Sequence, residues 1–186
     1  MDACPPEPFV NAARRAFPAD ARPQAEQAFT TLSRFVDDAY RQGAERYVVA
    51  GQEIALPRRL HFAGLGIGKV ERLSPAPACL VSRSTDGHLR QAAVRSLFAA
   101  NEAWVGPYVV SLLGEYVLEI VEDISAALPL LDRPLYADFV RENPAALRTL
   151  RARATSYWNV YHRTEYPLQR HFPALRSLDE LESWAG

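Results

Sequence analysis

The chain reads PYVVSLLGEYVLEIVEDISAA from Pro107 to Ala127, and this stretch decides the predicted fold. Proline is favoured in the first turn of a helix, and the apolar residues that follow recur at spacings of three and four. They form a wide apolar stripe of Val109, Val110, Leu113, Tyr116, Val117, Ile120, Val121 and Ile124. The sequence therefore predicts one long helix over 107–127 at the centre of a helical bundle.

Further helices are predicted on both sides of this stretch. Apolar residues at helical spacing run from Pro23 to Gln42, where Gly43 supplies a typical helix end. Asp86 and the two hydroxyl residues before it offer N-cap oxygens for the next helix. Pro167 and Pro173 argue against a long terminal helix and leave a turn or two at 175–184. The other predicted helices are 6–17, 84–100, 135–142 and a last long helix that begins at Pro144.

The segment 47–62 has the pattern of a small β-hairpin. Two apolar runs, 47–50 and 53–56, flank Gly51-Gln52, which resembles a two-residue turn with glycine first. Pro57 is expected to end the second strand, 60–62 to add a short third one, and 64–77 to form a loop. We therefore predict a mainly α fold: a single helical domain over 1–186, with five or six bundled helices and a hairpin.

Composition sets limits on the function. The net charge of −1 gives no overall field to attract nucleic acid or an anionic membrane. The two cysteines, Cys4 and Cys79, cannot build a disulfide framework, and residues 1–7 lack a secretory pattern. A cytoplasmic protein is expected, and the richness in alanine, arginine and proline is typical of a GC-rich bacterial genome.

The run DGHLRQAAVRSL, residues 86–97, resembles the second helix of a HEAT-type repeat. In that family an acidic residue opens the helix, an arginine follows, and small and apolar residues pack on neighbouring helices. The resemblance covers about 77–126, and no second copy follows at a period of roughly 40 residues. It implies stacked antiparallel helices whose surfaces bind proteins.

Glu115, Glu119 and Glu122 are spaced to share one face of the predicted helix 107–127. Neighbouring carboxylates can build a metal site or an acid–base pair, so a carboxylate-based hydrolase or metal enzyme is one alternative. A di-metal bundle also needs Glu-x-x-His pairs on partner helices, and the sequence has none. No metal and no cofactor are therefore expected, and the simpler interpretation is a solvated or arginine-paired face.

Arginines dominate the segment 141–176. Arg148, Arg151 and Arg163 lie near Tyr157 and Tyr161, which would suit an RNA-binding face that stacks bases on aromatic rings. The tyrosines and the neighbouring tryptophan fall on the apolar stripe of their helix, so we expect them in the core. Arginines that pair with the acidic helix are the favoured interpretation, and nucleic acid is not the expected partner.

These observations favour a non-catalytic protein-interaction module, with a bacterial immunity or accessory role as one instance. No complete catalytic set is found, so an enzyme is disfavoured without being excluded. Candidate binding residues are Glu115, Glu119, Glu122, Arg148, Arg151 and Arg163. The expected partner is another protein, and membrane binding is not expected.

Overall fold

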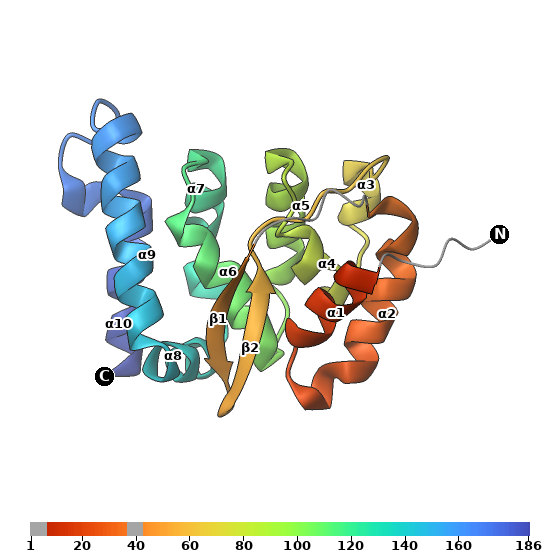
Figure 1. Cartoon of the computed structure of the whole chain (residues 1–186). Helices are drawn as coiled ribbons and strands as arrows, with labels where there is room; N and C mark the ends of the chain where they lie inside the picture. The colour runs from red at the N-terminus through yellow and green to blue at the C-terminus, as the bar shows by residue number, and fades with distance from the viewer. Residues whose placement is uncertain (1–6, 37–42) are drawn as a thin grey trace. The chain divides into compact units, whose positions relative to one another are not determined.

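The computed structural model describes residues 7–36 and 43–186, and this part of the chain is mainly helical (Figure 1). It contains ten α-helices, from 4 to 14 residues long. The predicted mainly α fold with a small hairpin is confirmed, and its helices are more numerous than the five or six expected. The helix predicted at 107–127 is divided, and α3 (Ile67–Val70), α4 (Pro75–Val81) and α10 (Pro173–Ala185) add to the number. The chain forms two compact units, Met1–Ala100 and Asn101–Gly186, called unit 1 and unit 2.

Unit 1 is a set of short helices with one hairpin. Its α-helices pack α1 on α2, α2 on α4, and both α3 and α4 on α5. The predicted apolar face of 23–42 is confirmed in α2, where Ala25, Ala28, Phe29 and Leu32 are buried. The elements are α1 (Glu7–Arg15), the 3-10 turn η1 (Ala19–Ala21), α2 (Arg22–Leu32), η2 (Ser33–Phe35), α3 (Ile67–Val70), α4 (Pro75–Val81) and α5 (Gly87–Leu97).

The N-terminal turns of α4 and α5 are set by a proline and by a capping aspartate. Asp86 caps α5 as predicted, because its carboxylate accepts from the backbone N–H groups of His88 at 2.8 Å and Leu89 at 3.4 Å. The loop predicted at 64–77 is wrong in part, since α3 and the start of α4 lie there. Proline is tolerated in a first helical turn, where its missing N–H would have no helical partner.

The hairpin pairs β1 (Ala44–Val49) with β2 (Gln52–Pro57) in antiparallel register, Tyr47 opposite Ile54. Pro57 ends the second strand, as predicted. The turn is Ala50-Gly51, one residue earlier than predicted, and both residues have positive φ, 49° and 75°. Such a turn matches the twist of the strands, and glycine is favoured in it. The expected third strand at 60–62 is absent among the described residues, where Leu60 and Phe62 make isolated bridges.

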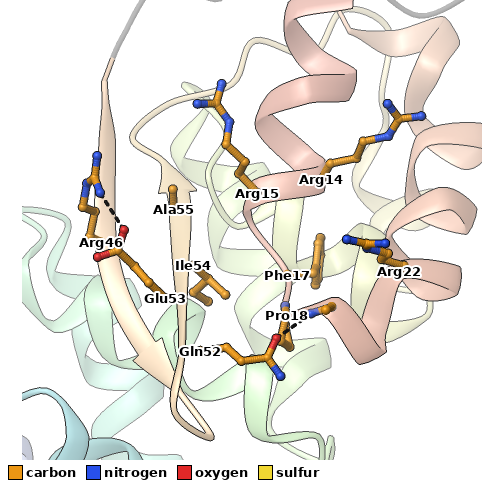
Figure 2. Close-up of a pocket in the computed structure, with 11 residues that line it drawn as sticks. Arg14, Arg15, Phe17, Pro18, Arg22, Arg46, Gln52, Glu53, Ile54 and Ala55 are labelled. Atoms are coloured by element: carbon orange, nitrogen blue, oxygen red, sulfur yellow. Dashed lines mark hydrogen bonds and ion pairs between the residues drawn. The ribbon is translucent and has the colours of Figure 1, made fainter.

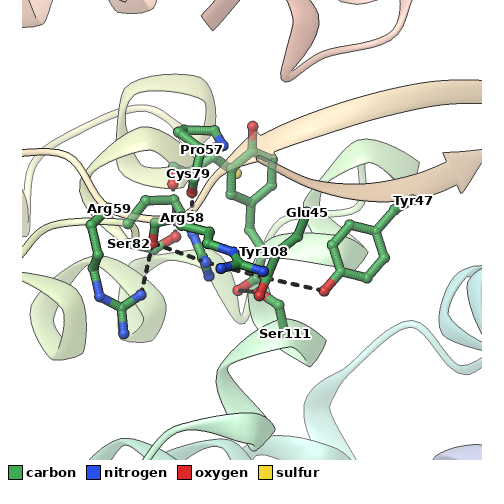
Figure 3. Close-up of polar contacts among 10 residues, drawn as sticks. Glu45, Tyr47, Pro57, Arg58, Arg59, Cys79, Ser82, Tyr108 and Ser111 are labelled. Atoms are coloured by element: carbon green, nitrogen blue, oxygen red, sulfur yellow. Dashed lines mark hydrogen bonds and ion pairs between the residues drawn. The ribbon is translucent and has the colours of Figure 1, made fainter. Parts of the chain in front are cut away.

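A buried arginine joins the hairpin to the helices of unit 1. Arg83, 2% exposed, follows α4 and donates from Nε to the Pro57 carbonyl oxygen at 2.9 Å. Its Nη2 lies 3.2 Å from the Arg58 carbonyl oxygen and 3.4 Å from Glu45 Oε2. Figure 3 labels three of these partners, Glu45, Pro57 and Arg58. The backbone of Leu60 also bonds to Arg83 and Thr85, at 2.7 and 2.8 Å. The chain leaving β2 is thus fixed to the α4–α5 turn.

Unit 2 packs around its last helix. The helix α10 contacts α7, α8, α9 and η4, and five of its residues are apolar and buried. The prediction of only a turn or two here is wrong, because Pro173 begins α10 instead of breaking it. The elements are η3 (Ala103–Val105), α6 (Gly106–Val110), η4 (Ser111–Gly114), α7 (Leu118–Ala127), η5 (Leu128–Leu130), α8 (Arg133–Glu142), α9 (Pro144–Tyr157), a π-turn (Trp158–His162), η7 (Gln169–His171) and α10 (Pro173–Ala185).

The predicted long helix 107–127 is divided. It begins as expected, with Pro107 in the first turn of α6, but η4 ends it at Gly114 and Glu115 is extended. A Cβ on Gly114 would lie 2.9 Å from Leu150 Cδ2 of α9. Any larger residue would therefore force the buried Leu150 side chain to shift. Leu112 and Leu113 before the break and Ile120 and Val121 after it are buried, which is why the pattern looked continuous.

Some expectations lie outside the described residues. Cys4 and the end of the predicted helix 23–42, from residue 37 onward, belong to this group. Cys79 is buried in α4. Within the described residues, no helix combines the length and the apolar character needed to cross a membrane.

The turn at Ala50 provides a test of the hairpin. A non-glycine residue with positive φ is strained by its Cβ. Ala50→Gly should therefore raise the free energy of unfolding by about 0.5–1 kcal/mol. The same change at Ala55, inside β2, should lower it by a similar amount, because glycine weakens a strand. Urea denaturation measures both, and a loss of stability in Ala50→Gly would contradict the turn assignment.

Candidate functional site

The three candidate glutamates do not share one helix face. Glu115 lies in the break before α7 and is 5% exposed, whereas Glu119 and Glu122 are exposed on α7. The expected acidic stripe is therefore wrong in its geometry, because it assumed one unbroken helix. Glu122 accepts a hydrogen bond from the Tyr166 hydroxyl at 2.6 Å. Across the described residues, no three His, Cys, Asp or Glu side chains gather as a metal site would require.

The candidate arginines differ in their surroundings. Arg151 Nη2 lies 2.8 Å from both Asp179 Oδ1 and Glu182 Oε2 of α10. Burial lowers the pKa of Arg151, but the hydrogen bonds and negative charges of the two carboxylates raise it by more. The net result is a pKa above the usual value for arginine. An internal pairing was predicted, but with the acidic helix 107–127 instead of α10. Arg163 donates to Asn159 at 3.1 Å and lies over the Trp158 ring, and Arg148 is exposed.

Aromatic rings form a connected series at the C-terminal end of α9. Tyr116 and Tyr157 have ring centroids 6.1 Å apart, and Tyr157 stacks on Tyr161 at 6.2 Å with an interplanar angle of 29°. His162 follows at 6.2 Å from Tyr161 and stacks on Phe172 at 5.4 Å. We call Tyr116, Tyr157 and Tyr161 the tyrosine cluster. The series runs from these partly exposed rings to Phe172, which is fully buried.

The π-turn places these rings. A π-turn adds a residue to the helical turn, so the side chains after it no longer follow the stripe of α9. Leu147, Leu150 and Ala154 of the stripe are buried, whereas Tyr161 is 64% exposed. The expectation that the tyrosines lie in the core is therefore wrong for Tyr161. The π-turn ends α9 and begins the reversal of the chain into residues 163–172.

A return segment, residues 163–172, fastens the π-turn to unit 2. Trp158 Nε1 donates to the Tyr166 carbonyl oxygen at 2.8 Å, and Tyr166 N donates to the His162 carbonyl oxygen at 2.8 Å. His162 Nε2 lies 3.2 Å from the Tyr116 carbonyl oxygen. Because a carbonyl oxygen only accepts, this contact places a proton on Nε2. The aromatic series is thus held by hydrogen bonds as well as by ring contacts.

The exposed part of this region is apolar and aromatic. Tyr116 is 55% exposed, and Val160, Tyr161 and Leu168 are exposed as well. Tyrosine offers a large rigid surface with few rotatable bonds, so little conformational entropy is lost when a partner covers it. The arrangement can therefore bind apolar or planar groups.

Sequence reasoning missed much of this site. Tyr116 was assigned to a buried stripe, and Tyr166 and Phe172 were not singled out. The density of aromatic residues and histidines in YWNVYHRTEYPLQRHF, residues 157–172, was a signal in the sequence. Comparison of the chain with family models, with curated proteins and with solved structures gives no match. The resemblance to HEAT-type repeats stays a prediction.

Arg151 and Arg148 lie on one helix and allow a matched test of pairing. Arg151→Ala removes two ion pairs of a side chain that is 34% exposed, so it should destabilise unit 2 by up to about 1 kcal/mol. Arg148→Ala should change stability by less than about 0.5 kcal/mol, as is usual for exposed positions. Urea denaturation measures the free energy of unfolding of both variants. Equal effects would contradict a stabilising role for the α9–α10 ion pairs.

Tyr166 should make the fold sensitive to alkaline pH. Burial raises the pKa of Tyr166 from 10.0 to about 12, and the hydrogen bond to Glu122 and its charge add to the shift. The neutral phenol therefore stabilises the folded state fully below about pH 10, and this contribution is lost as pH rises through 12. In Tyr166→Phe, the fall in melting temperature between these pH values should be smaller. An unchanged fall would contradict the assignment.

Proposed function

We propose that this chain is a non-catalytic protein-interaction module and that the tyrosine cluster is its contact surface. The observation that carries the proposal is the exposure of Tyr116 and Tyr161, 55% and 64%, within a series of aromatic rings in contact. Two such rings left in water need a reason, since tyrosine is normally better buried. An immunity or accessory protein of the bacterial cytoplasm is one instance of this proposal.

The rigidity of the cluster supports a protein partner. Interface cores are enriched in tyrosine, and a few aromatic residues supply most of the binding free energy. Tyr157 stacks against Tyr161, and Tyr157 also contacts Tyr116, so the surface is ordered before binding. Pre-ordering reduces the entropy lost on association. The partner would present apolar side chains that cover Tyr161 and the neighbouring Val160.

Single-stranded RNA is a second candidate ligand, favoured by the exposure of Tyr161 beside Arg163. Stacked tyrosines next to arginine are typical of surfaces that bind single strands. The charges argue against it. Arg151 is paired with Asp179 and Glu182. The carboxylate of Glu122 accepts the hydrogen bond of Tyr166 and adds a negative charge to this region. A backbone-binding face needs cations that are free to meet phosphates, so the protein partner ranks first.

A carboxylate-based enzyme receives less support than either binding function. Glu115 lies in the extended segment before α7, outside the helix, and Glu122 is hydrogen-bonded to Tyr166. The acidic residues that motivated this alternative therefore do not converge. We do not propose a reaction for this chain.

A site-specific photo-cross-linker at Val160 should capture the partner in cells. Val160 adjoins Tyr161 and is 66% exposed. The matched control is Leu130, which is 75% exposed and follows the far end of α7, a helix of ten residues or roughly 15 Å. We expect one dominant protein adduct at 160 that is absent at 130.

Binding of the purified partner then tests the tyrosine itself. Tyr161→Ala should weaken the affinity by about 2 kcal/mol, roughly thirtyfold, whereas Arg148→Ala should leave it nearly unchanged. Similar adducts at 160 and 130, or an equal loss in both variants, would contradict the proposal. An RNA adduct at 160 would instead favour single-stranded RNA as the ligand of the tyrosine cluster.

A further inference from the structure

A hollow in unit 1 gathers arginines from three elements. It has a volume of about 310 Å³ and lies where the end of α1, the start of α2 and the hairpin meet (Figure 2). Arg14 and Arg15 come from the last turn of α1, Arg22 from the first turn of α2, and Arg46 from β1. Four arginines from three elements of the chain thus line one hollow, with their guanidinium groups spaced around it (Figure 2). We call this place the arginine hollow.

The charges of the arginine hollow do not balance. Glu53 is the single acidic residue among those that line it, and Glu53 Oε1 is 2.6 Å from Arg46 Nη1. Asp20 of η1 is not part of the lining. Arg15 donates from Nε to the Asn11 carbonyl oxygen of its own helix. Its two Nη groups remain as donors for a ligand. Within the described residues, Arg14, Arg15 and Arg22 make no ion pair, and the described lining of the hollow sets four arginines against one glutamate.

Helix stability does not explain all of these arginines. Arg14 and Arg15 lie at the C-terminal end of α1, where a positive charge interacts favourably with the helix dipole. Arg22 is the first residue of α2, where a positive charge is unfavourable. Neighbouring like charges also repel each other. A bound anion would relieve both the repulsion and the unfavourable position of Arg22.

The base of the hollow is apolar and fixed. Phe17 and Ile54 are 4% and 1% exposed, and they pack beneath the arginines. Gln52 Oε1 accepts from the backbone N–H of Ala19 at 2.9 Å, which ties η1 to the start of β2. α1 also packs directly on β2. The backbone positions that carry the arginines are thus held together before any ligand binds.

We propose that the arginine hollow binds a small molecule through its phosphate groups, as in a diphosphate or a nucleotide. Guanidinium groups bind phosphate oxygens in two-point fashion, and several of them can share one diphosphate. The volume is at the small end of ligand pockets, roughly 300–1,000 Å³. The hollow therefore accepts the phosphates, and the rest of a nucleotide extends toward solvent. This site is independent of the tyrosine cluster.

Calorimetric titration of the full chain with inorganic pyrophosphate and with ATP tests the proposal. We expect saturable binding at one site, weakened at least tenfold in the double variant Arg14→Gln with Arg22→Gln. Arg72→Gln is the matched control, because Arg72 is exposed in unit 1 outside the hollow. It should change the affinity less than twofold. Loss of a positive charge at the start of α2 does not threaten folding, and circular dichroism verifies this.

A gain of affinity provides the second arm. Glu53→Gln removes the acidic group and releases Arg46, so it should tighten pyrophosphate binding about threefold. Glu71→Gln removes the same charge at an exposed position outside the hollow and should have no such effect. Absence of saturable binding, or equal weakening by Arg72→Gln and the double variant, would overturn the proposal. Tighter binding of a 20-nucleotide RNA than of ATP, lost in the double variant, would also overturn it in favour of a nucleic-acid surface.

Discussion

The buried guanidinium of Arg83 is the constraint on which unit 1 depends. A charge removed from water must be met by hydrogen bonds or an opposite charge, and Arg83 is met by the Pro57 and Arg58 carbonyl oxygens and by Glu45. A two-stranded hairpin is marginal by itself in water. The contacts of Arg83 hold the chain that leaves β2 against the α4–α5 turn. The wall that β1 and β2 give to the arginine hollow depends on this attachment.

The two candidate sites rest on different physics. At the tyrosine cluster the rings touch one another, and the surface offers contact area that gains free energy when water is removed. At the arginine hollow the charged groups are kept apart, and the expected gain is electrostatic, so salt would weaken it. One chain can therefore carry a protein contact on unit 2 and a small anion on unit 1. Neither site requires a catalytic group.

Local signals in the sequence predicted several elements, and long-range packing decided the others. Asp86, Pro57 and Pro107 act through their own backbone neighbours, so their roles could be predicted. The break after Gly114 lies against Leu150, 36 positions later, and no local pattern reveals this contact. Tyr161 was misplaced because the π-turn changes the helical period after Tyr157. The arginine hollow was missed because its residues come from α1, α2 and the hairpin, which are separate in the sequence.

Gly114 has a consequence for tracing the ancestry of this chain. A Cβ there would come within 2.9 Å of Leu150 Cδ2, so even a methyl group would force the buried Leu150 side chain to shift. A homologue that retains this packing should therefore retain glycine at this position, with a large apolar residue about 36 positions later. Together with the proline that opens α6, seven residues before, this gives a sparse fingerprint based on steric exclusion. Such a fingerprint can survive when most of the surrounding sequence has diverged.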